Sequence, residues 1–335
     1  MKKIKEKKDY FIILIIAVAL ALGLLIDDYY AMDVLITTLY FTGLACAWNI
    51  MSGYTGNLSL GHACFIGLAQ YTMIILYTKM KISPWVGMIL GAVISMALAV
   101  FIGVLSLRLK TFYFTLSTIA LTVIFMLLAT KFDGITGGAV GITVPFKPGF
   151  ENMTFQSPKV YFFMLAFLVV IVLLFTAYMS KSRFGSNLVA IREDDVAAAS
   201  LGINIFKNKV IALAISAVFT ALIGCVYMMY VLFIDPASAF NAVASNKCAI
   251  LTIIGGAGTV FGPLIGGLIL EPTEIFLRSW LGSTYQGAYL IVYGVILVCV
   301  VLFIPDGIYG TIRNKVVHAR SLREEKKAEN MRIEE

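Results

Sequence analysis

The sequence predicts an all-α, polytopic membrane protein with about ten transmembrane helices. Of its 335 residues, 60% are hydrophobic and only 13% are charged, and the mean hydropathy is +0.92. These values lie far outside the range of soluble globular domains. The apolar residues are gathered into runs long enough for an α-helix to cross the hydrocarbon core of a bilayer. We therefore expect most of the chain to be embedded in a lipid bilayer.

Seven apolar runs precede the C-terminal part of the chain, and each is long enough for a membrane-spanning helix. They cover residues 10–26, 31–51, 58–77, 84–107, 112–130, 159–179 and 208–234. Residues 238–280 are also apolar, but a glycine-rich stretch at 255–263 interrupts them. This pattern fits either one kinked span or two spans joined by a glycine turn. A last run at 286–304 is followed by a polar tail.

The distribution of Lys and Arg predicts the orientation of these spans, because cytoplasmic loops carry an excess of both residues. Basic residues at 2–8 place the N-terminus in the cytoplasm, and those that follow Ile304 place the tail there. Only an even number of spans puts both termini on one side, so residues 238–280 are predicted to form two spans and the total is ten. Lys79 and Lys81 fall on the outer side of the membrane in this topology, so they are local exceptions to the excess of basic residues in the cytoplasm.

The predicted organisation is a cytoplasmic N-terminus at 1–9, a transmembrane domain at 10–310 and a charged cytoplasmic tail at 311–335. The longest outside loop covers residues 131–158. We expect a multi-pass protein of the plasma membrane with both termini in the cytoplasm. The basic residues follow this topology and form no groove-like repeat, so a nucleic-acid partner is not expected.

The segment at 181–209 carries the densest charge between two apolar runs. Arg192, Glu193, Asp194 and Asp195 are adjacent in it. Each of these charges would cost about 2.5 to 3.5 kcal/mol at a bilayer centre, so the segment is predicted to lie in water on the cytoplasmic side.

Two short helices are predicted within this segment, around residues 188–191 and 196–201, where small and apolar residues flank the charges. Asp194 or Asp195 suits the N-cap of the second helix, since a carboxylate there accepts hydrogen bonds from free backbone N–H groups. Gly202 follows the predicted end of that helix, as glycine often does.

Helices this short are marginal alone, so we expect another structure to hold them. Three consecutive alanines would let the second helix approach a groove on a partner closely, which predicts a docking segment; the alternative is an ordinary solvated loop. The candidate docking residues are Ser186, Arg192, Glu193, Asp194, Asp195, Ala197, Ala198, Ala199 and Gly202.

Two glycine-rich breaks separate predicted spans, SGYTGNLSLGH at 52–62 and GGAGTVFGP at 255–263. Membrane proteins tolerate unwound backbone where it is buried in protein or lines a water-filled path, so these breaks predict either a polar path or tight turns with close helix packing. The candidate path residues are Gly53, Gly56, Asn57, Ser59, Gly61, His62, Gly255, Gly256 and Gly258.

The sequence shows no motif for nucleotide binding, metal binding or catalysis. No nucleotide-binding pattern G-x-x-x-x-G-K-[ST] occurs, so any ATP hydrolysis is expected to belong to another chain. His62 and Cys64 lack further metal ligands nearby, and neither a metal site nor a catalytic cluster is predicted. Lys247 is the one ionisable residue noted inside the predicted spans. This argues against an ion-coupled transporter, because such proteins bury charged groups to bind the coupling ion.

Five motifs in one order identify a family resemblance. They are GYTGNLSLGHACFIGLAQY, LRLKTFYFTLSTIALTVIF, ITGGAVGI, SRFGSNLVAIREDDVAAASLGIN and GGAGTVFGPLIGG. In this order they resemble the membrane-spanning permease subunits of branched-chain amino acid ABC importers, over about residues 30–310. The resemblance implies a vitamin B12-importer-like (type II) permease fold, with about ten helices, in which the loop at 182–207 is similar to the coupling helices that seat in the partner ATPases.

The same resemblance implies the partners and the cargo. A second homologous permease, two cytoplasmic ATPase subunits that bind ATP and Mg, and an extracytoplasmic solute-binding protein are expected, with no cofactor held by this chain itself. Leucine, isoleucine and valine are the expected cargo, although related permeases carry urea, amides or other amino acids. A stand-alone secondary transporter or channel is the main alternative. An integral membrane enzyme would need a catalytic cluster that the sequence does not show.

Overall fold

A computed structural model describes residues 23, 26–108, 111–281, 287–304 and 307–311. The first predicted span, at 10–26, falls almost entirely outside this range, as does the tail after 311. The remaining predicted spans can be compared with helices directly.

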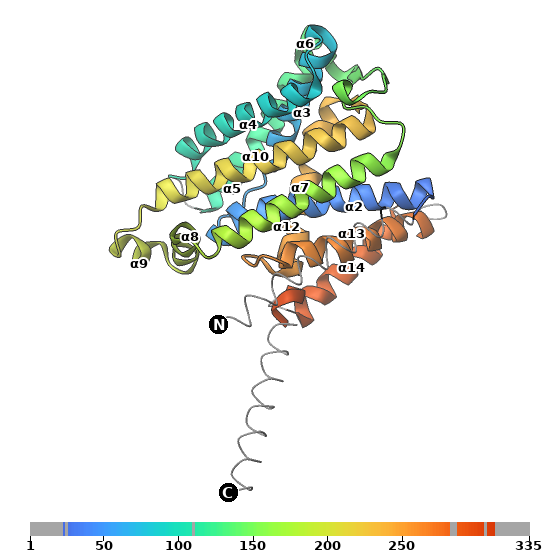
Figure 1. Cartoon of the computed structure of the whole chain (residues 1–335). Helices are drawn as coiled ribbons and strands as arrows, with labels where there is room; N and C mark the ends of the chain where they lie inside the picture. Colours follow the sequence, from blue (N-terminus) through green and yellow to red (C-terminus); the bar gives the residue numbers. More distant parts are fainter. Residues whose placement is uncertain (1–22, 24–25, 109–110, 282–286, 305–306, 312–335) are drawn as a thin grey trace, which may run out of the picture.

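The described chain is almost entirely helical (Figure 1). Its helices are α2 (Tyr29–Trp48), α3 (His62–Met80), α4 (Pro84–Ser106), α5 (Thr111–Lys131), α6 (Asp133–Thr136), α7 (Pro158–Met179), α8 (Arg183–Glu193), α9 (Asp195–Ser200), α10 (Ile205–Val231), α11 (Pro236–Ala239), α12 (Ala242–Gly256), α13 (Gly262–Leu281) and α14 (Ala288–Phe303). The other elements are the π-helix η1 (Asn49–Gly53), the 3₁₀ turns η2 (Gly138–Val140) and η3 (Phe150–Asn152), and the strands β1 (Ile142–Thr143) and β2 (Phe233–Ile234).

Seven helical segments of the described chain are long and apolar enough to cross a membrane. They are Tyr29–Gly53, His62–Met80, Pro84–Ser106, Thr111–Lys131, Pro158–Met179, Ile205–Val231 and Pro236–Gly256. Each coincides with a predicted span within a few residues, which confirms a multi-pass membrane protein. The total of ten stays a prediction, because α13 carries three charged residues and α14 is shorter than a full span.

Residues 238–280 fold as two helices rather than one kinked helix. α12 ends at Gly256 and α13 begins at Gly262, with a glycine-containing turn between them. Backbone atoms of the two helices nearly touch, since a side chain at Gly266 would overlap the Leu251 carbonyl oxygen. Small residues let the two helices approach this closely. The van der Waals contacts between them then stabilise the helix pair, since the hydrophobic effect does not drive helices together within lipid.

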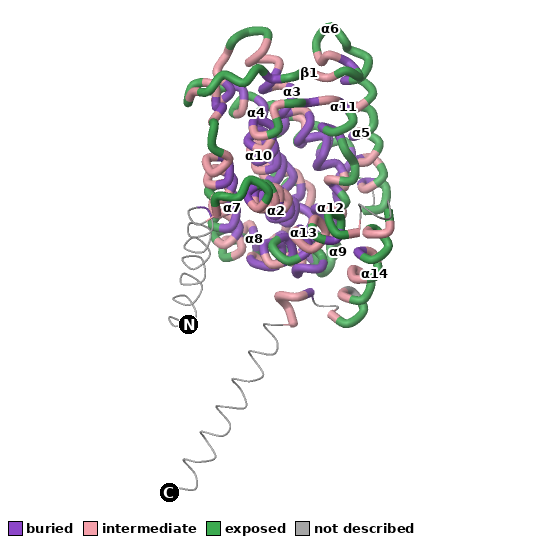
Figure 2. Tube along the Cα trace, turned by 90° about the vertical axis from the view of Figure 1, so that its right-hand side faces the viewer, coloured by how far each residue is buried: buried purple, intermediate pink, exposed green. Residues whose placement is uncertain are grey.

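α2 lies at the centre of the bundle and packs against α7, α10, α12 and α13 (Figures 1 and 2). α3, α4 and α10 form a second packed group. Close approach of α3 and α4 depends on Gly87 and Gly91, which are one helical turn apart and face Met73 and Ala69. This small-residue spacing is typical of membrane helix interfaces.

The two ends of the bundle differ. One end carries α6 and the short antiparallel pair β1–β2, in which Ile142 lies opposite Ile234. The other end carries α8 and α9 (Figures 1 and 2). α10 joins the two, because it begins just after α9 and ends at β2. We call these the α6 end and the α9 end.

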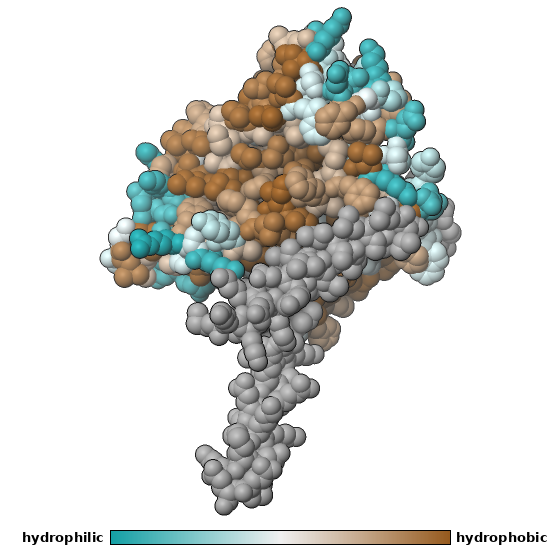
Figure 3. Space-filling view, in the orientation of Figure 1, coloured by the Kyte–Doolittle hydropathy of each residue, from teal (hydrophilic) through white to brown (hydrophobic). Residues whose placement is uncertain are grey.

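Apolar side chains cover the outside of the bundle as well as its interior. Figure 3 shows a broad hydrophobic region with hydrophilic residues at both ends. α4 and α5 contribute much of the exposed apolar surface, including Ile94, Leu105 and Leu127. A water-soluble protein would not expose a patch of this size, so this surface is the one that faces lipid.

A charge placed on this surface tests the membrane assignment. Ile94 is exposed near the middle of α4, and Ile94→Arg is expected to reduce the yield of membrane-inserted protein, since the charge costs about 2.5 to 3.5 kcal/mol at mid-bilayer depth. Leu105→Arg, near the end of the same helix, is the matched control and is expected to lower the yield less. Equal yields for both variants in isolated membranes would contradict a lipid-facing α4.

Candidate functional site

The loop between α7 and α10 folds as the two predicted helices. α8 is longer than expected, and its N-cap is Ser182, whose Oγ accepts a hydrogen bond from the Gly185 N–H at 3.2 Å. Asp194 caps α9, because its Oδ1 accepts from the Val196 N–H at 2.7 Å and the Ala197 N–H at 3.0 Å. Gly202 follows α9 with φ +80°, a backbone conformation that suits glycine. The predicted caps are therefore confirmed.

The predicted alanine face of α9 is exposed in part, since Ala197 and Ala199 are exposed and Ala198 is not. Ala198 is buried against the protein and only 1% exposed, so it is not available to a partner. Val196 and Leu201 are instead 77% and 79% exposed, and Ala197 lies on the same exposed side. A docking face on α9 is thus formed by larger apolar side chains than the sequence suggested.

Both ends of the charged run are bound to other parts of the chain. Asp195 Oδ2 lies 2.9 Å from Lys209 Nζ, and the Lys209 side chain is buried at the start of α10. Arg192 extends the other way, with Nη2 3.1 Å from Glu193 Oε1 and Nη1 donating to the Gly53 carbonyl oxygen at 3.3 Å. The loop is therefore attached to α10 and to the end of η1.

Arg192 fills a space between the two glycine-rich breaks. A Cβ atom at Gly56 would lie 3.0 Å from Arg192 Cγ, and one at Gly258 would overlap Arg192 Nη1. Both glycines also have φ near +73°, which side-chain-bearing residues rarely adopt. Glycine is needed at these positions because the arginine side chain occupies the room.

Asn49 joins the same two breaks directly. Its Oδ1 accepts a hydrogen bond from the Gly258 N–H at 2.8 Å, and its Nδ2 donates to the Thr259 carbonyl oxygen at 2.8 Å. Asn49 begins the π-helix η1, and a Cβ at Gly53 would overlap its amide oxygen. We call Asn49, Gly53, Gly56, Gly258 and Thr259 the glycine junction. Asn49 was missed from sequence, since nothing local distinguishes it from a span residue.

The remaining candidate path residues hold the 54–61 segment in place. His62 lies between two serines, with Nδ1 3.3 Å from Ser59 Oγ and Nε2 2.8 Å from Ser216 Oγ. Ser216 in turn donates to the Ala47 carbonyl oxygen at 2.7 Å. The Ser59 backbone is bonded as well, since its N–H donates to Ser52 Oγ at 3.1 Å and its carbonyl oxygen accepts from Trp48 Nε1 at 2.7 Å, so non-helical backbone is accommodated inside the bundle. A role in a transport path stays a prediction.

The other path candidates are also enclosed by the chain. Asn57 is buried, and its backbone N–H donates to Thr55 Oγ1 at 3.3 Å. A Cβ at Gly61 would lie 2.9 Å from Thr118 Cβ, and one at Gly255 would overlap the Gly262 carbonyl oxygen. Close backbone approach therefore accounts for these glycines.

Buried charge on α13 corrects the expectation that Lys247 is nearly alone within the spans. Lys247 Nζ lies 2.8 Å from Glu271 Oε1 and 3.1 Å from Glu274 Oε2, and 4.1 Å from the centre of the Phe41 ring. Glu271 is 1% exposed, and its Oε2 has no hydrogen-bond partner among the described residues. Buried carboxylates are therefore present, and their supposed absence cannot exclude an ion-coupled carrier.

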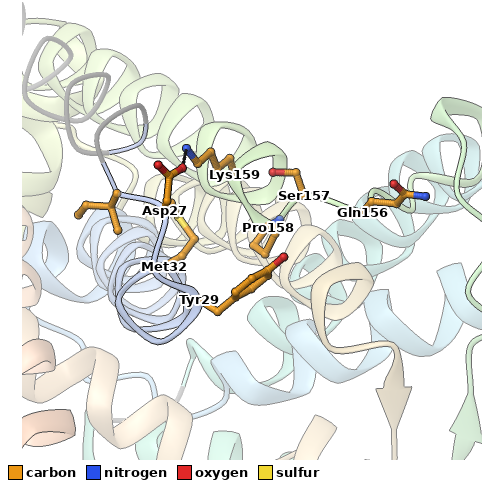
Figure 4. Close-up of a pocket in the computed structure, with 8 residues that line it drawn as sticks. Asp27, Tyr29, Met32, Gln156, Ser157, Pro158 and Lys159 are labelled. Atoms are coloured by element: carbon orange, nitrogen blue, oxygen red, sulfur yellow. Dashed lines mark hydrogen bonds and ion pairs between the residues drawn. The ribbon is translucent and has the colours of Figure 1, made fainter.

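A pocket of about 320 Å³ lies at the α6 end, where α2 and α7 begin (Figure 4). Asp27 and Lys159 form an ion pair at 2.6 Å on its wall, beside Tyr29, Met32 and Pro158. The pocket is one more place where opposite charges meet, in this case at the surface.

Comparison with known proteins decides the family. The family described as "Branched-chain amino acid transport system / permease component" matches residues 30–301. The chain belongs to this family. The match covers α2 to α14 and includes α8, α9 and the glycine junction.

Two curated relatives of this permease-family chain match most of its length, and a third matches less than half of it. The high-affinity branched-chain amino acid transport system permease protein LivM of Salmonella typhimurium is 24% identical over 330 residues, covering 92% of this chain and 76% of the relative. LivM of Escherichia coli is 23% identical with the same coverage. BraD of Pseudomonas aeruginosa is 34% identical over 158 residues, covering 45% of this chain and 47% of the relative. No solved structure matches.

The Asn49 hydrogen bonds give a test of the glycine junction. Asn49→Ala removes both bonds and leaves partly buried backbone groups unpaired, so the permease is expected to lose about 1 to 3 kcal/mol of stability. The melting temperature of the detergent-solubilised protein measures the effect. Asn246→Ala, at an exposed position on α12, is the control and is expected to leave it unchanged. Equal melting temperatures for the two variants would contradict the assigned role of Asn49.

The buried charge cluster predicts a non-additive pair of substitutions. Lys247→Met leaves two carboxylates facing apolar surroundings and is expected to cost about 3 to 5 kcal/mol. Adding Glu271→Gln should recover part of this loss, because one uncompensated charge is removed. Asp27→Asn breaks an exposed ion pair and should cost about 0.2 to 1 kcal/mol. A double variant less stable than Lys247→Met, by the same melting assay, would show that the charges do not compensate one another.

Proposed function

We propose that this chain is the permease subunit of an ATP-driven importer for branched-chain amino acids. The family match over residues 30–301 is the observation that carries the proposal. Relatives named as branched-chain amino acid permeases support the cargo class, with leucine, isoleucine and valine as its members. Urea, amides and other amino acids are the alternative cargoes.

The proposed importer contains further subunits. A second permease would complete the translocation path, two ATPases would supply the energy of ATP hydrolysis, and an extracytoplasmic binding protein would deliver the cargo. ATP and Mg belong to the ATPases in this proposal, since the sequence holds no nucleotide-binding motif. The proposal also includes the type II fold, ten spans and cytoplasmic termini.

α8 and α9 are the proposed seat for one ATPase. They form the structured end of the bundle opposite the β1–β2 pair, and α9 presents Val196 and Leu201 to solvent. A short exposed helix with apolar side chains on its outer face suits a groove on a partner. Glu193 and Ser186 are exposed on α8 and would lie at the rim of such a contact.

Co-purification tests this function. Val196→Glu and Leu201→Glu place charge where a partner groove would bury an apolar side chain, a burial worth about 1.5 to 3 kcal/mol each. We expect roughly tenfold or greater loss of ATPase subunits from the purified complex, with insertion into the membrane unchanged. Val140→Glu, an exposed apolar position at the α6 end, is the matched control.

Two results would contradict the proposal. Normal recovery of the ATPases with both α9 variants would remove α9 from the contact. Uptake of leucine into vesicles without ATP or ATPase subunits would favour a stand-alone secondary transporter instead.

A further inference from the structure

Arg192 connects the α8–α9 loop to transmembrane helices that are distant in sequence. Its Nη1 donates to the carbonyl oxygen of Gly53, 139 residues away, and its side chain also faces Gly56 and Gly258. We propose that Arg192 is the positioning residue through which displacement of α8 and α9 reaches the inner transmembrane helices. This inference rests on the proposed function, because it requires an ATPase that moves the loop.

Only a few residues separate Arg192 from α9 along the chain. Arg192 lies in the last turn of α8, and Asp194, two residues later, is the N-cap of α9. Leu188 and Ile191 on α8 are buried, so the helix is held against the bundle along one side. A force applied to the exposed face of α9 therefore reaches Arg192 through a few residues of fixed backbone.

The transmembrane residues near Arg192 lie at the ends of three helices, α2, α12 and α13. Gly53 ends η1 at the end of α2, and Gly258 lies in the turn between α12 and α13. Asn49 ties these two segments together through the Gly258 N–H and the Thr259 carbonyl oxygen. Displacement of the guanidinium would thus act on α2, α12 and α13 together, and α2 also packs against α7 and α10.

The chemistry of the contact favours transmission over simple solvation. A guanidinium group carries five N–H donors in a rigid plane, which suits backbone carbonyl oxygens such as that of Gly53. The glycines bring the backbone close to the arginine side chain, which is 35% exposed, since a Cβ at Gly56 would lie 3.0 Å from Arg192 Cγ and one at Gly258 would overlap Nη1. Close-packed contacts pass on small displacements because they have little slack.

The other charged residues of the loop do not make this connection. Asp195 pairs with Lys209 on α10, which follows the loop directly in sequence. Asp194 caps α9, and Glu193 is exposed beside Arg192. Arg192 is therefore the residue of this charged run whose contacts join the loop to both glycine-rich breaks.

The test uses the complete importer reconstituted in vesicles, with uptake of radiolabelled leucine and ATP hydrolysis measured together. Arg192→Gln is expected to lower leucine uptake per ATP hydrolysed by about fivefold or more, while the ATPases still co-purify. Gly258→Ala should lower the same ratio, because its methyl group displaces the guanidinium. The double variant should be no worse than the more impaired single variant, since both changes break one link.

Arg183→Gln removes an exposed arginine from the first turn of α8 and is the matched control, with a wild-type ratio expected. A wild-type ratio for Arg192→Gln, or additive effects in the double variant, would overturn the inference. If Arg192→Gln fails to insert, Arg192→Lys replaces it, and failure of both would assign Arg192 to folding. Wild-type protein that recovers no ATPases would instead refute the proposed function, so the two failures are distinguishable.

Discussion

Backbone hydrogen bonding without water is the constraint on which this structure depends. Inside a bilayer every N–H and C=O group must find a partner within the protein, and the two glycine-rich breaks interrupt the helices that would otherwise supply one. Asn49 and Arg192 provide part of the replacement, through the backbone of Gly53, Gly258 and Thr259. Trp48 and Thr118 provide more within the 54–61 segment, since Trp48 Nε1 donates to the Ser59 carbonyl oxygen at 2.7 Å and Thr118 Oγ1 accepts from the Leu60 N–H at 3.2 Å. The breaks are thus satisfied by side chains from distant helices.

This arrangement places unwound backbone next to the loop proposed to meet the ATPase. Regular helices resist local bending, whereas a π-helix and a glycine turn change direction at lower cost. The α2 end and the α12–α13 turn are such elements, and the Asn49 side chain joins them by a hydrogen bond to the Gly258 N–H. Family membership and this geometry together describe a permease whose deformable backbone is concentrated beneath its most charged loop.

Enclosing the charged cluster of Lys247, Glu271 and Glu274 within the protein also costs free energy. An ion pair in a dry interior is offset only when its geometry is good, and here one lysine serves two carboxylates beside the Phe41 ring. Intramembrane charge is often functional. In this chain it fixes α12 against α13, and family membership rather than an absence of charge decides against a stand-alone carrier.

The sequence by itself determined the membrane class, the seven confirmed spans and the capped helices of the charged loop, because hydropathy and capping act over a few neighbouring residues. It also marked the glycines as special. Only the tertiary structure decided why: Gly56 and Gly258 make room for Arg192, and Gly53 makes room for the Asn49 amide, which bonds Gly258, 209 residues away. The tertiary structure also decided that Ala198 is buried and Leu201 is exposed. Burial of a side chain on a short helix is set by what the helix packs against and not by the composition of the helix.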